Sequence, residues 1–413
     1  MSRVLVGLHQ LELGGSQLNA LDLATGLRDR GHVVEVFAAH TGEYGPMAEI
    51  VRERGLPLAT VEHPRDRPGR YPCRRGVAAA MTAHARWMKA DFLHVYEYPL
   101  ILDAFYGPAR SLGTPLVGTV LAMAVPTWLP RSATLIAGTE KLVEGGRAVG
   151  QEISLIEPPV NPAWDDPDGA DGAGFRRRHR IGEDELLLGI VCRLNPDMKE
   201  EGVGRAMRAI EQLDPRGERR LRLVVTGDGP SYGRLASLAS TVNERLGRDA
   251  VVMTGAMADS RPAYAAADIA LGMGGSALRA MAYGKPLVVL GIEGFSRPFD
   301  EETAAYFLEE GFYGIGGGEP EPLAEQIAPL LDEGRRRQLG EWSRAVVLDR
   351  FGLDAALDTL EAVFERAGER SEPWLPSALH TTAQRTASEL AGERVRQRVK
   401  PVVHWALARG AAT

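Results

Sequence analysis

The chain has 413 residues, with 48 Lys plus Arg against 55 Asp plus Glu and a formal net charge of −7. A hydrophobic fraction of 44% can build a core, which excludes disorder throughout the chain, and the length predicts two domains or one large one. The acidic balance argues against a protein that binds nucleic acid through its net charge. Two cysteines, Cys73 and Cys192, are too few for a disulfide framework or a four-cysteine zinc site.

The sequence carries no apparent secretory or membrane segment. Residues 1–7 run into a turn too soon for a secretory h-region, and no stretch reaches about 18 consecutive apolar residues. We expect both cysteines to be reduced, and we therefore predict a cytoplasmic protein.

The N-terminal half predicts short buried strands that alternate with helices. An apolar run at residues 4–8 is followed by Gly14-Gly15-Ser16, by apolar residues at helical spacing, and by a second apolar run at residues 33–38. Such alternation is typical of an α/β protein with a parallel, doubly wound sheet. The further elements predicted in this half are a helix at residues 47–54 and strands at residues 58–61, 92–96, 116–120 and 134–137.

Residues 158–174 are rich in Pro, Gly and Asp, which predicts a linker. We therefore predict two Rossmann-like domains, at residues 1–160 and 172–345, followed by a crossover helix and tail at residues 346–413. A long helix at residues 353–366 is expected to cross back to the first domain. Because ligand loops follow the carboxyl ends of parallel strands, we expect the site in a cleft between the domains. The strands predicted in the second half lie at residues 186–191, 221–226, 250–254, 269–271 and 286–290.

Two glycine-rich turns precede predicted helices. Gly14 and Gly15 stand before the first helix, and Gly274, Gly275 and Ser276 separate the strand at residues 269–271 from the next helix. Glycine lets a ligand approach the backbone closely, and the N–H groups at a helix start favour an anion. A purely structural turn is the alternative for each. The first turn lacks the spaced glycines of a dinucleotide-binding site.

Two cations occupy one loop directly after the predicted strand at residues 186–191. Arg193 and Lys199 there suit a diphosphate, because an arginine binds it as a fork and a lysine as a point charge. Lys199 is also one of only five lysines in the chain. The alternative is a solvated loop in which Glu200 and Glu201 neutralise both cations. The turn at residues 226–230, rich in Gly and Pro, is predicted to be structural.

Three polar residues close the strand predicted at residues 92–96. His94, Tyr96 and Glu97 can supply acid–base or hydrogen-bonding groups at the end of a strand. For His94 the alternative is a core histidine whose hydrogen bonds are satisfied.

Taken in this order, the motifs resemble those of the GT-B-fold glycosyltransferases, most of all family 4, which are retaining enzymes that use nucleotide-sugars. The resemblance covers roughly residues 3–366 and implies two Rossmann-like domains that face an interdomain cleft. The motifs that carry it are Leu13-Gly14-Gly15-Ser16, Arg30-Gly31-His32, Arg193-Leu194 with Lys199, Gly227-Asp228-Gly229-Pro230 and Ala280-Met281-Ala282.

The resemblance implies that Arg193 and Lys199 hold the donor diphosphate and stabilise the charge that grows on it. Glu97 and Tyr96 are the other predicted catalytic residues. Such enzymes need no metal, and the nucleotide-sugar is a co-substrate, so we expect no cofactor. The remaining residues of the predicted donor site are Gly14, Gly15, Gly255, Met257, Gly274, Gly275, Ser276 and Arg279. The resemblance implies that the backbone near Gly255 to Met257 meets the nucleobase.

Two departures from the family pattern concern the site. The family usually carries two glutamates separated by seven residues, but Arg279 stands at the second position and a short glycine loop replaces the first. Tyr96 stands where the family often has a histidine. These departures indicate an unusual donor, an unusual acceptor or reduced activity.

The acceptor is expected on the N-terminal domain, beside His94 and Trp128. Its loops are predicted at residues 65–75, which are strongly basic, and 119–129, and it is either a small molecule or lipid-linked. The basic amphipathic stretch at residues 384–400 predicts a docked or partly solvated terminal helix, with a weak contact to a membrane surface or a partner as the alternative, and a homodimer is a further option. Two other functions stay open: a catalytically silent GT-B partner protein and a non-hydrolysing nucleotide-sugar epimerase.

Overall fold

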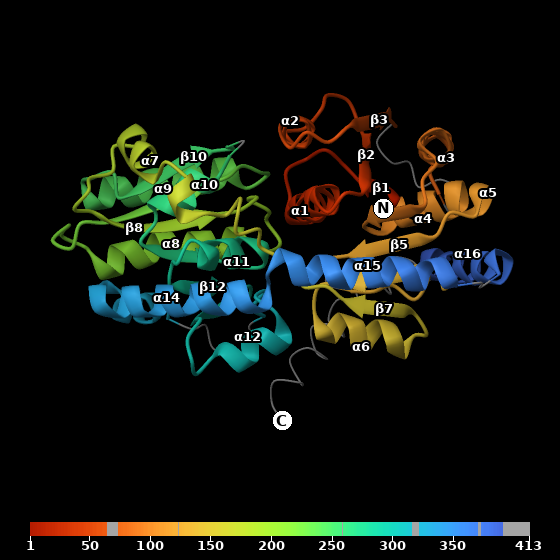
Figure 1. Ribbon diagram of the computed structural model, residues 1–413. Coiled ribbons are helices and arrows are strands. Elements are labelled where there is room, and N and C mark those ends of the chain that lie inside the picture. The colour runs from red at the N-terminus through yellow and green to blue at the C-terminus, as the bar shows by residue number, and fades with distance from the viewer. Residues whose placement is uncertain (64–72, 123, 258, 316–321, 371–372, 391–413) are drawn as a thin grey trace. The chain divides into compact units, whose positions relative to one another are not determined.

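The computed structural model describes residues 1–63, 73–122, 124–257, 259–315, 322–370 and 373–390. Within them the chain forms two compact units, each with its own sheet and core (Figure 1). Unit 1 contains Met1–Pro159 together with the described residues from Leu353 onward, and unit 2 contains Val160–Gly352. Both units are α/β, in agreement with the predicted fold class.

Unit 1 is built on a seven-stranded parallel sheet with the order β3-β2-β1-β4-β5-β6-β7. The chain leaves β1 toward one edge and returns at β4 toward the other, so the loops that follow these two neighbouring strands meet at a topological switch point. The strands are β1 (Arg3–Leu8), β2 (Val33–His40), β3 (Leu58–Glu62), β4 (Phe92–Tyr96), β5 (Leu116–Val120), β6 (Thr134–Ala137) and β7 (Glu152–Leu155).

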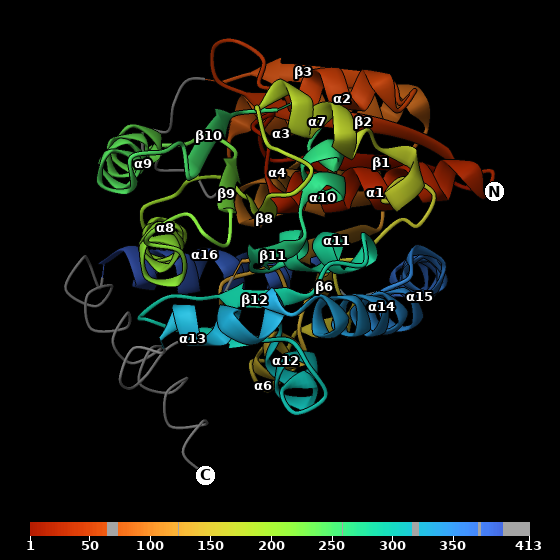
Figure 2. The same cartoon turned by 90° about the vertical axis from the view of Figure 1, so that its left-hand side faces the viewer.

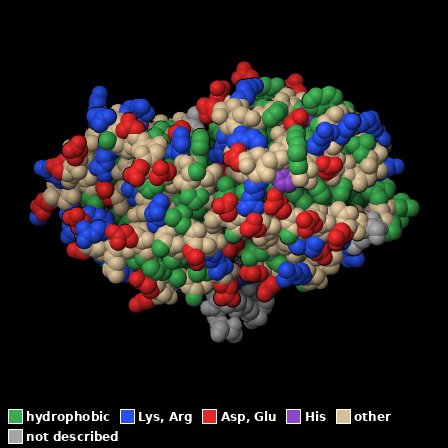
Figure 3. All heavy atoms as spheres, in the orientation of Figure 1, with side chains coloured by type: hydrophobic (Ala, Val, Ile, Leu, Met, Phe, Trp, Pro, Cys, Tyr) green, Lys and Arg blue, Asp and Glu red, His purple; other side chains and the backbone are tan. Residues whose placement is uncertain are grey.

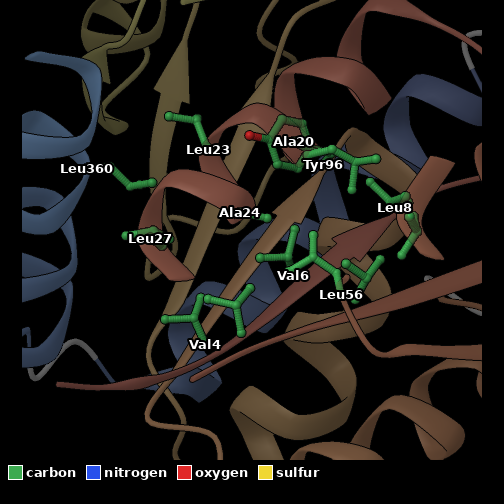
Figure 4. Packing of buried hydrophobic residues seen from close by; sticks show 14 of the residues in the cluster. Val4, Val6, Leu8, Ala20, Leu23, Ala24, Leu27, Leu56, Tyr96 and Leu360 are labelled. Carbon is green, nitrogen blue, oxygen red and sulfur yellow. The ribbon is translucent and has the colours of Figure 1, made fainter. Parts of the chain in front are cut away.

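Helices cover both faces of this sheet. On one face the buried side chains of Leu23 and Leu27 meet Leu360 of the C-terminal helix α15 (Figure 4). The predicted return of a C-terminal helix to the first half of the chain is therefore confirmed. The helices of unit 1 are α1 (Gly15–Asp29), α2 (Met47–Glu53), α3 (Arg75–Met88), α4 (Tyr98–Ala104), the π-helix η1 (Phe105–Ala109), α5 (Arg110–Leu112), α6 (Glu140–Ala148), α15 (Leu353–Glu369) and α16 (Trp374–Leu390).

Unit 2 has a six-stranded sheet with the order β10-β9-β8-β11-β12-β13, and its switch point lies between β8 and β11. All pairs are parallel except β12–β13. The helices α8, α9 and α13 cover one face, and α10, α11 and α14 cover the other (Figure 2). The strands are β8 (Leu186–Val191), β9 (Leu221–Thr226), β10 (Val251–Gly255), β11 (Ile269–Gly272), β12 (Leu287–Leu290) and β13 (Ser296–Pro298). The helices are η2 (Pro167–Gly169), α7 (Gly172–Arg178), α8 (Glu200–Leu213), α9 (Tyr232–Leu246), α10 (Arg261–Ala266), α11 (Gly275–Ala282), α12 (Ala304–Glu310), α13 (Leu323–Ile327), η3 (Ala328–Leu331) and α14 (Glu333–Arg350).

The prediction of a linker at residues 158–174 is wrong for most of that segment, which is built into unit 2. The backbone N–H of Val160 donates to the carbonyl of Phe351 at 2.8 Å, and both residues are buried. The carboxylate of Asp165 is fully buried, and that of Asp171 accepts from the Gly174 N–H and caps α7. Pro, Gly and Asp indicate irregular backbone correctly for residues 158–166, but η2 and the start of α7 are helical, and composition does not reveal whether the polar groups have partners inside the fold.

The surface carries both signs of charge. Figure 3 shows Lys and Arg interspersed with Asp and Glu over the face in view, without a broad field of one sign. Among the described residues, no helix combines the length and the apolar character that crossing a bilayer demands.

Candidate functional site

The switch point of unit 2 brings two of the predicted motifs together. Arg193 and Lys199 lie in the loop after β8, and the glycine loop follows β11, the neighbouring strand. Lys199 lines a small cavity together with Cys192 of its own loop and with Gly272 and Met273 of the glycine loop. Ligand sites of doubly wound sheets occur at such points, because the two loops diverge there and leave space.

The two cations of this loop are not neutralised by the acids that follow them. Glu200 accepts a hydrogen bond from Nε of Arg234 at 2.8 Å, and Glu201 accepts from the backbone N–H groups of residues 293 and 294 at 3.0 and 2.6 Å. Within the described part of the chain, the side chains of Arg193 and Lys199 form no ion pair. Arg193 is exposed, whereas burial in the cavity lowers the pKa of Lys199. Neither cation is therefore neutralised by a carboxylate of the described residues.

The turn after β9 is hydrogen-bonded to the loop that contains Arg193. The Leu194 N–H donates to the Asp228 carbonyl at 2.9 Å, and the Ser231 N–H donates to the Leu194 carbonyl at 3.0 Å. A Cβ at Gly227, whose φ is +140°, would lie 1.9 Å from the Cys192 carbonyl oxygen. The turn thus acts as a structural support that only glycine permits at this position, in keeping with the prediction for residues 226–230.

The start of α11 is open to an anion. Gly274 precedes the helix with a φ of +59°, and no side chain caps the first turn, which contains no acidic residue. The Ser276 hydroxyl donates to the Met273 carbonyl at 2.9 Å, so it does not occupy the N–H groups at the helix start. A Cβ at Gly275 would meet nothing within 4 Å. These N–H groups can bind a phosphate oxygen, since the helix dipole favours negative charge there.

The loop predicted to meet the nucleobase follows β10. Gly255 has a φ of +77°, and its carbonyl accepts from the Gly227 N–H at 2.9 Å, which ties this loop to the turn after β9. Met257 is half-buried against the small core around α7. Gly255 and Met257 thus belong to the same edge of unit 2 as Arg193.

Arg279 has a partner that the sequence did not suggest. Its guanidinium Nη1 lies 2.8 Å from Oδ1 of Asp165, and the two side chains are 13% and 0% exposed. Asp165 comes from the segment predicted as a linker, so no signal in the sequence pointed to this pair. Arg279 is therefore held by a buried carboxylate one turn inside α11.

Unit 1 has a corresponding switch point, formed by the loops after β1 and β4. Gly14 and Gly15 begin α1, whose first turn has neither a side-chain cap nor an acidic residue, and a Cβ at Gly15 would meet nothing within 4 Å. Glu97 follows β4 with a φ of +68°, and its Oε1 accepts from the Leu121 N–H at 3.3 Å. Burial raises the pKa of Glu97 to about 7, although hydrogen bonds from the backbone of residues 121 and 122 oppose the shift.

Two residues predicted beside this site lie in the core. His94 is 1% exposed and hydrogen-bonds through Nε2 to the Thr119 hydroxyl at 2.8 Å, and burial lowers its pKa to about 3. Tyr96 is fully buried, and its hydroxyl donates to Asn19 at 3.0 Å. This burial argues against direct contact of either side chain with a substrate and favours the core alternative that the sequence left open for His94.

Trp128 and Tyr98 form an aromatic pair next to Glu97. Their rings meet edge to face with centroids 5.7 Å apart, and the Tyr98 hydroxyl donates to the Ala124 carbonyl. Arg385 of α16 lies over the Trp128 ring at 5.9 Å. Tyr98 is a candidate that the sequence reasoning missed, although it directly follows Glu97. Of the basic loop predicted at residues 65–75, residues 65–72 lie outside the described part of the chain.

Both units match known protein families. A family model described as a glycosyl transferase 4-like domain matches residues 14–139, and one described as glycosyl transferases group 1 matches residues 185–333. Together they cover more than half of the chain.

In the described residues, no three His, Cys, Asp or Glu side chains gather in a way that could hold a metal ion.

Individual relatives agree with these matches. The 2-deoxystreptamine glucosyltransferase of Streptomyces kanamyceticus is 28% identical over 70% of this chain and 82% of its own length. The D-inositol 3-phosphate glycosyltransferase of Kineococcus radiotolerans is 28% identical over 87% and 93%. Anabaena HepE, solved in complex with UDP-glucose, shares the fold with a TM-score of 0.66 at 17% identity, over 89% of this chain and all of that chain. The chain therefore belongs to the glycosyltransferases of the GT-B fold, with a glycosyl transferase 4-like domain in unit 1 and a group 1 domain in unit 2.

Proposed function

We propose that the chain transfers a sugar from a nucleotide-sugar to an acceptor hydroxyl in the cytoplasm, with retention and without a metal ion. The observation that carries this proposal is the pairing of Arg193 and Lys199 with the uncapped start of α11 at one switch point. As the bond between sugar and diphosphate breaks, negative charge grows on the leaving diphosphate. Two cations and a helix start stabilise that charge, and electrostatic stabilisation of this kind supplies most of the rate enhancement in many enzymes.

The proton of the acceptor hydroxyl needs a destination in this reaction. In the retaining mechanism that the resemblance implies, the leaving phosphate accepts it, so no separate protein base is required. Glu97 can still contact the acceptor hydroxyl, because a carboxyl with a pKa of about 7 can hold or release a proton near neutrality. We propose that it hydrogen-bonds the acceptor from unit 1.

The ligands and substrates named for similar proteins indicate which donor nucleotides and acceptors to test first. HepE was solved with UDP and with UDP-glucose, which makes uridine diphosphate the first donor nucleotide to test. The two named relatives act on 2-deoxystreptamine and D-inositol 3-phosphate, both polyhydroxylated rings, which favours a small acceptor of this kind over a lipid-linked one.

Titration calorimetry of the full chain with UDP, GDP, ADP and dTDP tests the donor class. We expect micromolar to millimolar binding of one nucleotide, because two cations and a helix start face the same ligand. If none of the four binds, the proposed transfer and the epimerase alternative both fail. Binding without turnover of any nucleotide-sugar would instead favour the catalytically silent partner.

Turnover measurements test the two cations. Arg193→Ala and Lys199→Ala should each lower kcat by about 10²–10³-fold, as the loss of one charge-stabilising donor does in other enzymes. Arg208→Ala is the matched control, since Arg208 is an exposed arginine of α8. Turnover retained in both site variants would contradict the role of this loop.

The predicted contact of the C-terminal region with a membrane surface or a partner also stays a proposal. α16 docks on unit 1, where Trp374 stacks on Phe105, and it exposes Leu375 and Leu379. Hydrophobic side chains reach the surface at the right-hand edge of Figure 3, the end at which α16 lies in Figure 1. Residues 391–400 of the basic stretch lie outside the described part of the chain.

A further inference from the structure

Unit 2 contains a buried ion pair between Arg279 and Asp165, which fixes the orientation of the arginine more than it stabilises the fold. Arg279 Nη1 and Asp165 Oδ1 are 2.8 Å apart, and the Asp165 side chain is completely shielded from solvent. Removing two charges from water costs about as much as their attraction returns, so such a pair contributes little net stability. What it does provide is a fixed position for the planar guanidinium, which would otherwise sample many rotamers.

Aromatic side chains hold the surroundings of this pair. Tyr264 of α10 and Tyr283 at the end of α11 are stacked at 5.7 Å with an interplanar angle of 18°. Arg261 lies 3.8 Å over the Trp164 ring and is close enough to Asp165 for that carboxylate to help raise its pKa. Three segments that are separate in sequence therefore converge on Arg279.

One member of this cluster has an unused hydrogen-bonding group. Tyr283 is only 3% exposed, and its hydroxyl has no hydrogen-bond partner among the described residues. The charged groups that act on it are Asp165, Arg261, Asp259 and Arg279. A buried hydroxyl without a partner is costly, because it has given up its hydrogen bonds to water without replacing them, and such groups are uncommon in native proteins.

The cluster joins two loops of the candidate donor site. Arg279 is one turn from the uncapped start of α11, and its Cα–Cβ bond tilts toward that start, as in any α-helix. Arg261 begins α10 and follows the loop after Gly255, the predicted nucleobase contact. A nucleotide bound along the edge from the α11 start to this loop would pass the Arg279 guanidinium.

We propose that Asp165 is a positioning residue that fixes Arg279 to recognise the nucleoside diphosphate part of the donor. This inference rests on the proposed function, because it requires a nucleotide at this edge. Arg279 donates hydrogen bonds to an oxygen of the nucleotide, either a phosphate oxygen or a ribose hydroxyl.

A double-mutant cycle with UDP as the probe tests the coupling. Asp165→Asn keeps the shape of the side chain and removes its charge, and Arg279→Met keeps the length and removes the fork. We expect each to weaken UDP binding about tenfold by calorimetry, and the double variant to bind no more weakly than Arg279→Met alone. An unchanged Kd in Asp165→Asn, or losses that add fully in the double variant, would overturn the inference.

Further variants separate this role from a structural one. Arg279→Lys retains the positive charge beside Asp165 but not the planar fork, so it should keep the melting temperature while losing UDP affinity. Loss of stability with unchanged UDP affinity in all variants would leave a structural ion pair and overturn the proposal. Titration of the same variants with uridine distinguishes a phosphate oxygen from a ribose hydroxyl as the partner of Arg279. Loss of a phosphate contact weakens the binding of UDP alone, whereas loss of a ribose contact weakens the binding of both UDP and uridine.

Lys199→Ala distinguishes failure of this inference from failure of the proposed function. If Lys199→Ala loses UDP and the variants at Asp165 and Arg279 do not, only the positioning role is overturned. If the unmodified chain binds no nucleotide, both ideas fall together.

Discussion

At the scale of single residues, Glu97 gives the sharpest prediction. Its pKa of about 7 in the folded protein exceeds the value near 4.3 of an unfolded chain, so the folded state binds a proton that the unfolded state has already released between these values. The contribution of Glu97 to the free energy of unfolding therefore falls as the pH rises from about 4.3 to 7. Glu97→Gln should raise the melting temperature relative to the unmodified protein at pH 8 and leave it nearly unchanged at pH 4.

Thermal melts of both proteins across this pH range provide the measurement. Glu152→Gln is the control in the same unit, since it makes the same chemical change at a glutamate that is exposed on β7. A stabilisation by Glu97→Gln that is equal at pH 4 and pH 8 would show that the charge of Glu97 is not its cause.

The sequence located the cations and glycines of the site, but not the partners that orient them. Arg193, Lys199 and the glycines follow buried strands, and the position of a strand end is readable from an apolar run that stops at Gly or Arg. Asp165 could not be found in this way, because a single acid in a loop rich in Pro and Gly has no periodicity. Its partner Arg279 is 114 residues away in sequence.

At the scale of elements, apolar runs predicted the central strands well. The ranges of β4, β5, β6, β8 and β9 agree with the prediction, because strands buried on both faces are continuous runs of Val, Ile and Leu. β7 and β13 were missed. They lie at the edges of their sheets, where exposed residues such as Glu152 and Arg297 interrupt the apolar pattern.

The attachment of α15 to unit 1 combines apolar packing with ion pairs, and we expect packing to dominate. Leu360 is fully buried, so Leu360→Ala should cost about 2–5 kcal/mol. Arg30 pairs with Asp358 at 2.6 Å and Glu361 at 2.9 Å, but these carboxylates are 73% and 33% exposed, so Arg30→Ala should cost about 1 kcal/mol or less. Melting temperatures of the two variants measure the difference, and a loss in Arg30→Ala that equals or exceeds the loss in Leu360→Ala would contradict the expectation.

At the scale of the whole molecule, the two units differ in how the chain completes them. Within the residues that the structure describes, unit 2 is one continuous segment, whereas unit 1 needs residues from both ends of the sequence. We expect a fragment of residues 160–352 to melt cooperatively alone, because its core is complete within that segment. A fragment of residues 1–159 should not, since Leu23 and Leu27 would face water without α15.

Circular dichroism melts of the two fragments check this expectation, and a chain of residues 1–159 joined by a Gly/Ser linker to residues 353–390 is the control. Restored cooperativity in the joined chain would assign the defect to the missing helices. A cooperative melt of residues 1–159 without them would contradict the expectation.

The dependence of unit 1 on α15 also sets an order of events during synthesis. Roughly 190 residues of unit 2 separate the two parts of unit 1. At about 5–20 residues per second, the ribosome needs on the order of 10–40 s to reach α15 after it has completed β7. For that interval the leucines of α1 lie on a surface that the finished enzyme never exposes, which makes the nascent N-terminal half a client for chaperones until the last helices emerge.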